Sequence, residues 1–252
     1  RRVLEEYEQA DGRPRILIGE IHDLNYASLV RYYGEDLDEL HVPFNFGMLQ
    51  VPWNAPAIRS LVNSYEAALP PGAWPNYVLD NHDDPRVATR VGGLPQARIA
   101  MLLLLTLRGS STLYNGEELG MQDVPIPPEL EQDPFGKNVP GLGLGRDPCR
   151  TPMPWDASVN GGFCPPDVTP WLPLGENLQN ANVAAELADP RSMLSLTRRL
   201  LALRRATPAL TAGSYQSLDG AGVPDDCFVY LREANGERLL VALNFADGER
   251  TI

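Results

Sequence analysis

The sequence predicts an α/β protein in which a parallel α/β barrel or doubly wound sheet precedes a small antiparallel β domain. Two observations carry this prediction. Between residues 15 and 118, short apolar segments that end in polar residues alternate with helical patterns. After residue 213 the hydrophobic period changes to two, which is typical of antiparallel strands.

Two strands and an amphipathic helix are expected first. Residues 15–20 form an apolar run that ends in Glu20, and such runs suit strands buried on both faces. A second short run covers residues 40–45. Apolar residues at the spacing i, i+3, i+4 and i+7 then predict a helix over residues 55–69.

Two more strands enclose a second helix. The third strand, residues 77–79, leads into the polar segment 80–83. Residues 96–107 are apolar on nearly every side, which predicts a buried helix closed by Gly109. The fourth strand is expected over residues 111–115. Four such parallel strands would make half of an eight-stranded barrel.

A long loop and a β-hairpin follow. Residues 123–190 contain most of the 24 prolines and little periodicity, and loops of this length usually have a function. Asn235-Gly236 lies between two segments of period two, which is a strong hairpin signal. We therefore expect a partial barrel over residues 1–212 and a truncated C-terminal β domain over residues 213–252.

The composition excludes several classes of function. The 252 residues are 43% hydrophobic and 21% charged, as in ordinary globular proteins. A formal net charge of −12 repels phosphate backbones, so no nucleic-acid partner is expected. The longest apolar run, residues 99–107, is shorter than the ~20 residues that cross a bilayer, so no membrane partner is expected.

Three cysteines lie outside any CxxC spacing, which argues against a metal site. Their odd number favours reduced thiols, with a pairing of Cys149 and Cys164 as the alternative. We expect no metal in this chain.

Acidic residues follow two of the predicted strands. Glu20 ends the first strand, and Asp83, preceded by His82, follows the third. Because the carboxyl ends of parallel barrel strands face one mouth, these side chains can converge on one substrate. A solvated loop carboxylate is the plainer interpretation of either acid alone, but a His-Asp pair leaving a buried strand favours a functional site.

Several segments resemble the α-amylase superfamily, glycoside hydrolase family 13. Residues 77–86, with Asn81-His82-Asp83, resemble its fourth signature region, and residues 18–20 resemble its third. Similarity to the α-glucosidase and oligo-1,6-glucosidase branch is found at residues 116–121, 146–156 and 201–204. The resemblance implies the C-terminal half of a (β/α)8 TIM barrel, strands 5–8, followed by part of a small antiparallel β-sandwich domain.

The resemblance also implies a retaining α-glucosidase-type hydrolase that removes terminal α-linked glucose from short oligosaccharides. It makes Glu20 the general acid/base and Asp83 the acid that holds the sugar 2- and 3-hydroxyls. A retaining glycosidase needs one protonated carboxyl and a second carboxylate about 5–5.5 Å away. Partial burial and nearby negative charge would keep Glu20 protonated.

Further residues receive binding or structural roles from the same resemblance. His82 would donate a hydrogen bond to a sugar hydroxyl. Arg150 would contact the sugar, with Arg146 as the alternative, and Arg86 would either orient carboxylates or bind a glucose hydroxyl. Glu117 is expected to be a structural partner of an arginine.

The family's nucleophile lies in an earlier segment of the type Gly-Phe-Arg-hydrophobic-Asp, and no such segment occurs in this chain. We therefore expect a fragment that is inactive alone. No cofactor is expected, and a structural Ca²⁺ would belong to the missing N-terminal half. The expected location is cytoplasmic, and the sequence leaves the oligomeric state open.

Two alternatives remain open at this point. A trehalose synthase or a sucrose-acting transglucosidase of the same superfamily would share these motifs. A non-catalytic relative that resembles the heavy subunits of amino-acid transporters would be expected to lose part of the acid set, whereas Glu20, His82 and Asp83 are all present.

Overall fold

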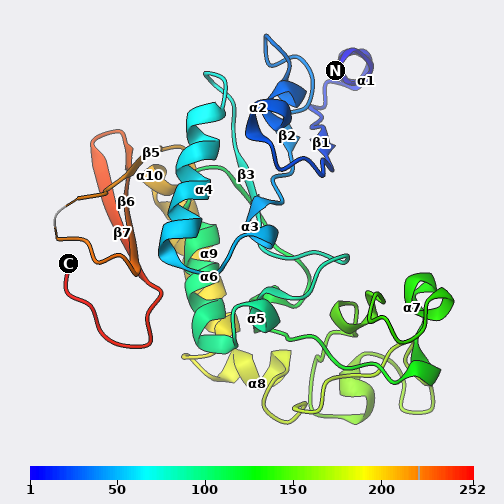
Figure 1. Ribbon diagram of the computed structural model, residues 1–252. Helices are drawn as coiled ribbons and strands as arrows, with labels where there is room; N and C mark the ends of the chain where they lie inside the picture. The colour runs from blue at the N-terminus through cyan, green and yellow to red at the C-terminus, as the bar shows by residue number, and fades with distance from the viewer. Residues whose placement is uncertain (221) are drawn as a thin grey trace. The chain divides into compact units, whose positions relative to one another are not determined.

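The computed structural model describes residues 1–220 and 222–252, which fall into two compact units (Figure 1). The first unit comprises Arg1–Val78, Leu104–Thr112 and Arg204–Ile252, and the second comprises Leu79–Leu103 and Leu113–Leu203. Each unit has its own elements, and helices α6 (Leu94–Thr106) and α9 (Met193–Ala206) contribute residues to both.

The strands of the described chain belong to the first unit. Its elements are α1 (Arg2–Asp11), β1 (Ile18–Gly19), α2 (Tyr26–Leu29), η1 (Val30–Tyr33), β2 (Val42–Pro43), α3 (Gly47–Gln50), α4 (Ala55–Ala68), β3 (Asn76–Val78), β4 (Ser110–Thr112), α10 (Pro208–Thr211), β5 (Ser214–Ser217), β6 (Cys227–Ala234) and β7 (Glu237–Asn244). The second unit contains α5 (Val87–Arg90), η2 (Glu117–Leu119), η3 (Pro128–Leu130), α7 (Pro134–Asn138), η4 (Asp147–Cys149), η5 (Val159–Gly162) and α8 (Val183–Ala188).

The four strands expected in the first half of the chain pair in parallel, in two separate sheets. β1 pairs with β2, and β3 pairs with β4 with Asn76 opposite Ser110. The Asn76 amide links the second pair, since its Nδ2 donates to Ser110 O at 3.1 Å and to Thr112 Oγ1 at 2.9 Å. The parallel direction agrees with the prediction. A continuous four-stranded sheet does not form in the described residues, because each ladder is only two or three residues long.

Helix α4 confirms the predicted amphipathic pattern. Asn54 caps its N-terminus by accepting a hydrogen bond from Ala57 N at 2.9 Å, a type of contact worth about 1 kcal/mol. The buried face is formed by the residues of the i, i+3, i+4, i+7 set, Ile58, Leu61, Val62 and Tyr65. The helix therefore covers the core with the face that its sequence predicts.

Helix α6 is buried around its circumference, as its uniformly apolar sequence predicts. Leu103, Leu104 and Leu105 are adjacent in sequence and each is at most 1% exposed. The chain leaves the helix through Gly109, whose φ is +116° and whose Cβ, if present, would lie 2.5 Å from Pro75 O. Only glycine fits this turn.

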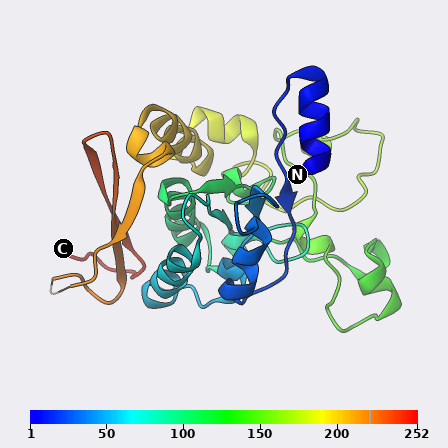
Figure 2. The same ribbon diagram turned by 90° about the horizontal axis from the view of Figure 1, so that it is seen from above.

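A three-stranded antiparallel sheet, β5-β6-β7, follows α10 in the first unit (Figure 2). Its hairpin turn is Asn235-Gly236, and both residues have positive φ, as the predicted two-residue turn requires. The sheet is clustered with the N-terminal segments in one unit. A domain boundary between residues 212 and 213 therefore remains a prediction.

Two buried arginines join the end of α6 to the rest of the first unit. Arg232 is completely buried on β6 and donates to Thr106 O at 2.5 Å and Gly213 O at 3.0 Å. Arg204 donates to Leu105 O at 2.9 Å and also to Gly109 O. Carbonyl groups at a helix C-terminus lack intrahelical partners, so both guanidiniums satisfy groups that would otherwise be unpaired.

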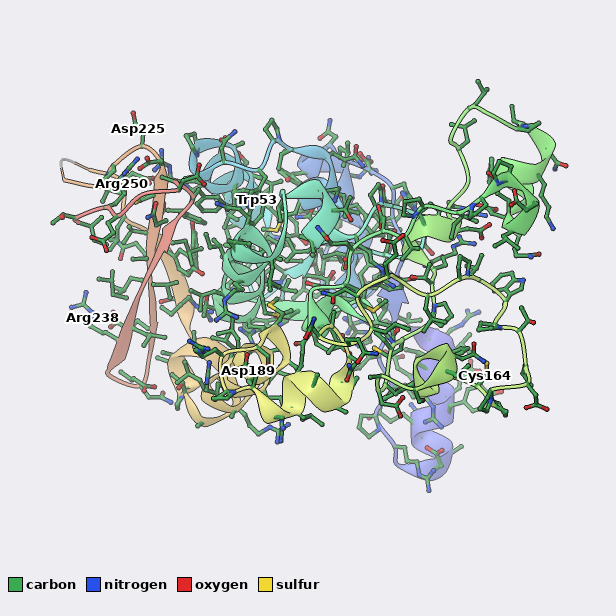
Figure 3. The ribbon with its side chains drawn as sticks, turned by 90° about the horizontal axis from the view of Figure 1, so that it is seen from below. Trp53, Cys164, Asp189, Asp225, Arg238 and Arg250 are labelled. Atoms are coloured by element: carbon green, nitrogen blue, oxygen red, sulfur yellow. The ribbon has the colours of Figure 1, made fainter. Side chains whose placement is uncertain are left out.

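The second unit is dominated by irregular structure. Between residues 123 and 190 its longest helix is α8, which spans six residues. Cys149, Cys164 (labelled in Figure 3) and Cys227 are all free thiols, as expected. Among the described residues, no helix is long and apolar enough to cross a membrane, and no cluster of three or more His, Cys, Asp or Glu side chains could hold a metal ion.

Candidate active site

The polar segment after β3 is shaped by the side chain of Asn81. Asn81 Oδ1 accepts hydrogen bonds from the backbone N–H groups of Asp83 and Asp84, both at 2.8 Å. Asparagine commonly bonds its own backbone two residues on in this way, which fixes a tight turn. The turn therefore sets the backbone from which the Asp83 side chain projects.

Three cationic or cation-forming side chains approach one oxygen of Asp83. Arg146 Nη1 lies 2.8 Å, Arg150 Nη2 2.9 Å and His82 Nε2 3.6 Å from Asp83 Oδ1. Arg150 Nε also donates to the carbonyl oxygen of His82 at 2.6 Å. The structure thus brings together Asp83, His82 and Arg150 as predicted, and it adds Arg146.

The charge of Asp83 follows from these contacts. Partial burial by itself raises the pKa of Asp83, but the hydrogen bond from Arg146 and the neighbouring positive charges outweigh it, so that the pKa lies below its ordinary value. The Asp83 side chain is 28% exposed, which leaves it accessible to a ligand. At neutral pH Asp83 is therefore a carboxylate that can accept hydrogen bonds.

Arg146 is itself held by a second acid that the sequence analysis did not single out. Arg146 Nε and Nη2 donate to Asp133 Oδ2 and Oδ1 at 2.8 and 2.9 Å, and the Asp133 side chain is fully buried. The hydrogen bonds from Arg146 hold the pKa of Asp133 far below its ordinary value. An aspartate in a proline-rich loop carries no sequence signal for such a role until its distant partner is known.

Arg86 is buried away from solvent. It is 1% exposed, its Nη1 donates to Asn115 O at 2.8 Å, and its guanidinium lies 5.0 Å from the centre of the Tyr114 ring. Its backbone N–H donates to Asp123 Oδ1 at 2.9 Å. These contacts favour an orienting role over direct contact with a sugar, which remains an untested prediction.

Glu117 faces an acid, in place of the arginine partner that the sequence analysis expected. Asp80 and Glu117 are both buried, and the charge of Asp80, after burial itself, raises the pKa of Glu117 well above its ordinary value. Asp80 Oδ1 and Glu117 Oε1 have no hydrogen-bond donor among the described residues. One proton shared between the two carboxyl groups satisfies both oxygens.

Glu20 belongs to the first unit, where its ion-pair partner is His22. The two side chains are separated by 3.3 Å between Oε1 and Nε2, and they are 54% and 62% exposed. The His22 ring stacks on Phe46 with 4.7 Å between ring centroids. The partial burial expected for Glu20 is not found in this chain, because its carboxylate faces solvent. Convergence of Glu20 with Asp83 remains a prediction.

A strand-end carboxylate held by two arginines defines a class of site suited to binding vicinal hydroxyl groups, as in sugars. Comparison with known proteins identifies the family: the chain belongs to the α-amylase family, because the family model described as "Alpha amylase, catalytic domain" matches residues 1–213.

Curated relatives carry names of one kind. Maltase A1 of Drosophila melanogaster is 34% identical over all of this chain and 44% of its own length. The salivary alpha-glucosidase of Anopheles gambiae is also 34% identical, over all of this chain and 43% of its own. An oligo-1,6-glucosidase of Halalkalibacterium halodurans is 31% identical over 90% of this chain and 46% of its own. The resemblance to this branch is confirmed, and the chain spans about half the length of these relatives.

Solved structures agree with the family assignment. The alpha-glucosyl transfer enzyme XgtA has a TM-score of 0.85 and 34% identity over 97% of this chain and 45% of its own. The trehalulose synthase MutB from Pseudomonas mesoacidophila has a TM-score of 0.81 and 28% identity over 97% of this chain and 50% of its own. The fold is therefore that of the α-amylase family.

Proposed function

We propose that this chain is part of a retaining α-glucosidase-type hydrolase that removes terminal α-linked glucose from short oligosaccharides. The observation that carries the proposal is the ionised Asp83, held by Arg146 and Arg150 beside His82. The names of the curated relatives, which are maltases and α-glucosidases, support it.

Asp83 in this proposal binds the sugar in the transition state. A carboxylate can accept hydrogen bonds from two vicinal hydroxyls, and these bonds strengthen as positive charge develops at the anomeric carbon. His82 donates to a sugar hydroxyl, and Arg150 contacts the glucose from the same side as its bond to Asp83. Arg86 acts indirectly, through the backbone around residue 115.

Glu20 is the proposed general acid/base. It donates a proton to the leaving oxygen and later takes one from water, while a carboxylate supplied from outside these 252 residues acts as the nucleophile. Support for an outside nucleophile comes from the absence of a Gly-Phe-Arg-hydrophobic-Asp segment in the sequence and from the length of the relatives.

The finer architecture is part of the proposal. We place β1 to β4 in the second half of a (β/α)8 barrel, since both pairs are parallel, with residues 1–212 as the barrel portion. The antiparallel strands β5, β6 and β7 would belong to a β-sandwich that begins near residue 213.

The general-acid role of Glu20 is testable in a protein that carries the complete catalytic domain. Glu20→Gln is expected to lower kcat/KM on maltose by roughly a hundredfold or more, with a much smaller loss on p-nitrophenyl α-glucoside, whose leaving group needs no proton. Steady-state kinetics on both substrates is the measurement. Equal losses on the two substrates would show that Glu20 is not the acid.

A second candidate function is transfer of the glucosyl group. It is favoured by structural relatives named as an alpha-glucosyl transfer enzyme and a trehalulose synthase. Product analysis by NMR after incubation with maltose, isomaltose, trehalose and sucrose separates hydrolysis from transfer. A non-catalytic, transporter-type role is disfavoured by the presence of Glu20, His82 and Asp83 together.

A further inference from the structure

We infer that Arg146 and Asp133 form a positioning pair that fixes the orientation of Asp83, and that they act on the reaction only through it. This inference rests on the proposed function for its kinetic consequences. Its structural content concerns how one loop of the second unit controls a carboxylate after β3.

The first step is the geometry of the Arg146 side chain. Its guanidinium uses separate N–H groups for two acids: Nη1 for Asp83 at 2.8 Å, and Nε with Nη2 for Asp133 at 2.8 and 2.9 Å. The contact to Asp133 uses both carboxylate oxygens, and such two-point contacts fix direction as well as distance. The position of Asp133 therefore determines where Nη1 can point.

The second step is the rigidity of Asp133. Its carboxylate is fully buried, and a buried anion is retained only where its partners satisfy it. Asp133 Oδ2 also accepts from the backbone N–H of Arg146 at 2.7 Å. Removing Asp133 would leave the guanidinium of Arg146 free to rotate.

The third step is the closure of the loop between these residues. Asp147 Oδ2 accepts from the backbone N–H groups of Gln132 and Asp133, at 2.6 and 2.9 Å. The two ends of the segment 132–147 are thus joined by backbone contacts as well as by the ion pair. Within that closed segment, the ring of Phe135 lies 4.9 Å from the guanidinium carbon of Arg146.

The consequence for Asp83 is a division of labour between its two oxygens. In the part of the chain that the structure describes, Arg146, Arg150 and His82 all approach Oδ1, so Oδ2 is the oxygen that can accept a hydrogen bond from a sugar hydroxyl. Arg150 alone would allow the carboxylate to turn about it. Two arginines from different directions hold it in one orientation.

The kinetic test compares variants of the protein with the complete catalytic domain. Asp133→Asn and Arg146→Lys are expected to lower kcat on maltose roughly ten- to a hundredfold with KM within about threefold, because a misplaced group lowers transition-state binding more than ground-state binding. Arg146→Lys keeps the charge and loses the planar fork, so it separates geometry from charge. Wild-type kcat in both variants would overturn the inference.

A matched control comes from the first unit. Asp226 and Arg250 (labelled in Figure 3) form another two-oxygen pair, with Nε 3.0 and 2.8 Å from the carboxylate oxygens. Asp226→Asn should leave kcat unchanged within about twofold. Thermal melts of all variants show whether the folded fraction, and not the positioning of Asp83, accounts for a loss.

A measurement without turnover keeps this inference separate from the proposed function. Arg146→Gln should raise the titration midpoint of the Asp83 carboxyl, followed by ¹³C NMR without substrate, by about one pH unit, since His82 and Arg150 then face it alone. An unchanged midpoint contradicts the inference even if the enzyme is active. A raised midpoint in a wild-type protein that cleaves no α-glucoside supports the inference and refutes the proposed function.

Discussion

The ionised state of Asp83 makes a sharp prediction at the scale of a single residue. Asp83→Asn in the protein with the complete catalytic domain should lower kcat roughly a hundred- to a thousandfold while KM for maltose changes little, because the lost bonds strengthen in the transition state. Kinetics with added azide provides the control. Azide should restore no turnover, since Asp83 is not the nucleophile, and formation of β-glucosyl azide would overturn the assignment.

The sequence predicted the residues of this cluster to the extent that they share a short segment or a motif. His82 and Asp83 follow a buried strand, and Arg150 lies in a segment similar to the α-glucosidase branch. Asp133 could not be predicted, because its function depends on Arg146, which is thirteen residues away across a loop without periodicity. Burial and a charged partner are properties of the folded chain.

At the scale of elements, the turn after β3 and the start of η2 each supply one acid to the buried Asp80–Glu117 pair. Both pKa values are raised by burial, so these groups bind more protons in the folded than in the unfolded state above their ordinary pKa values. The stability that they contribute is therefore present at low pH and is lost as the pH rises through the raised pKa values.

Glu117→Gln should accordingly raise the free energy of unfolding at pH 8 relative to wild type, with little gain at pH 5, because the amide donates a hydrogen bond without losing a proton. Denaturant unfolding at both pH values is the measurement. Glu118→Gln is the matched control, since Glu118 accepts a hydrogen bond from Gly116 N at 2.8 Å. An equal response of the two variants at pH 8 would argue against the shared proton.

Most elements were predictable where one physical signal dominates. The spacing of apolar residues gave helix α4, and Asn235-Gly236 gave the hairpin between β6 and β7. The division of the parallel strands into two pairs was not predictable. Apolar runs indicate buried strands but carry no information on which neighbour each strand bonds.

At the scale of the whole molecule, the 252-residue chain alone should hydrolyse no p-nitrophenyl α-glucoside, because the proposed nucleophile lies outside it. It should also self-associate, since Ile16 and Ile18 at β1 are 68% and 59% exposed. Light scattering after size-exclusion chromatography and an activity assay provide the measurements. A sharp monomeric melt together with turnover would contradict both expectations.

The two buried arginines at the end of α6 have a consequence for how the first unit opens. Arg232 on β6 and Arg204 on α9 bond carbonyl groups between residues 105 and 109, so the helix end cannot fray without releasing the sheet. Native-state hydrogen exchange reports such groups as one cooperative unit. The amides of β6 and of the last turn of α6 should therefore exchange through the same opening event, although about 120 residues separate them in sequence.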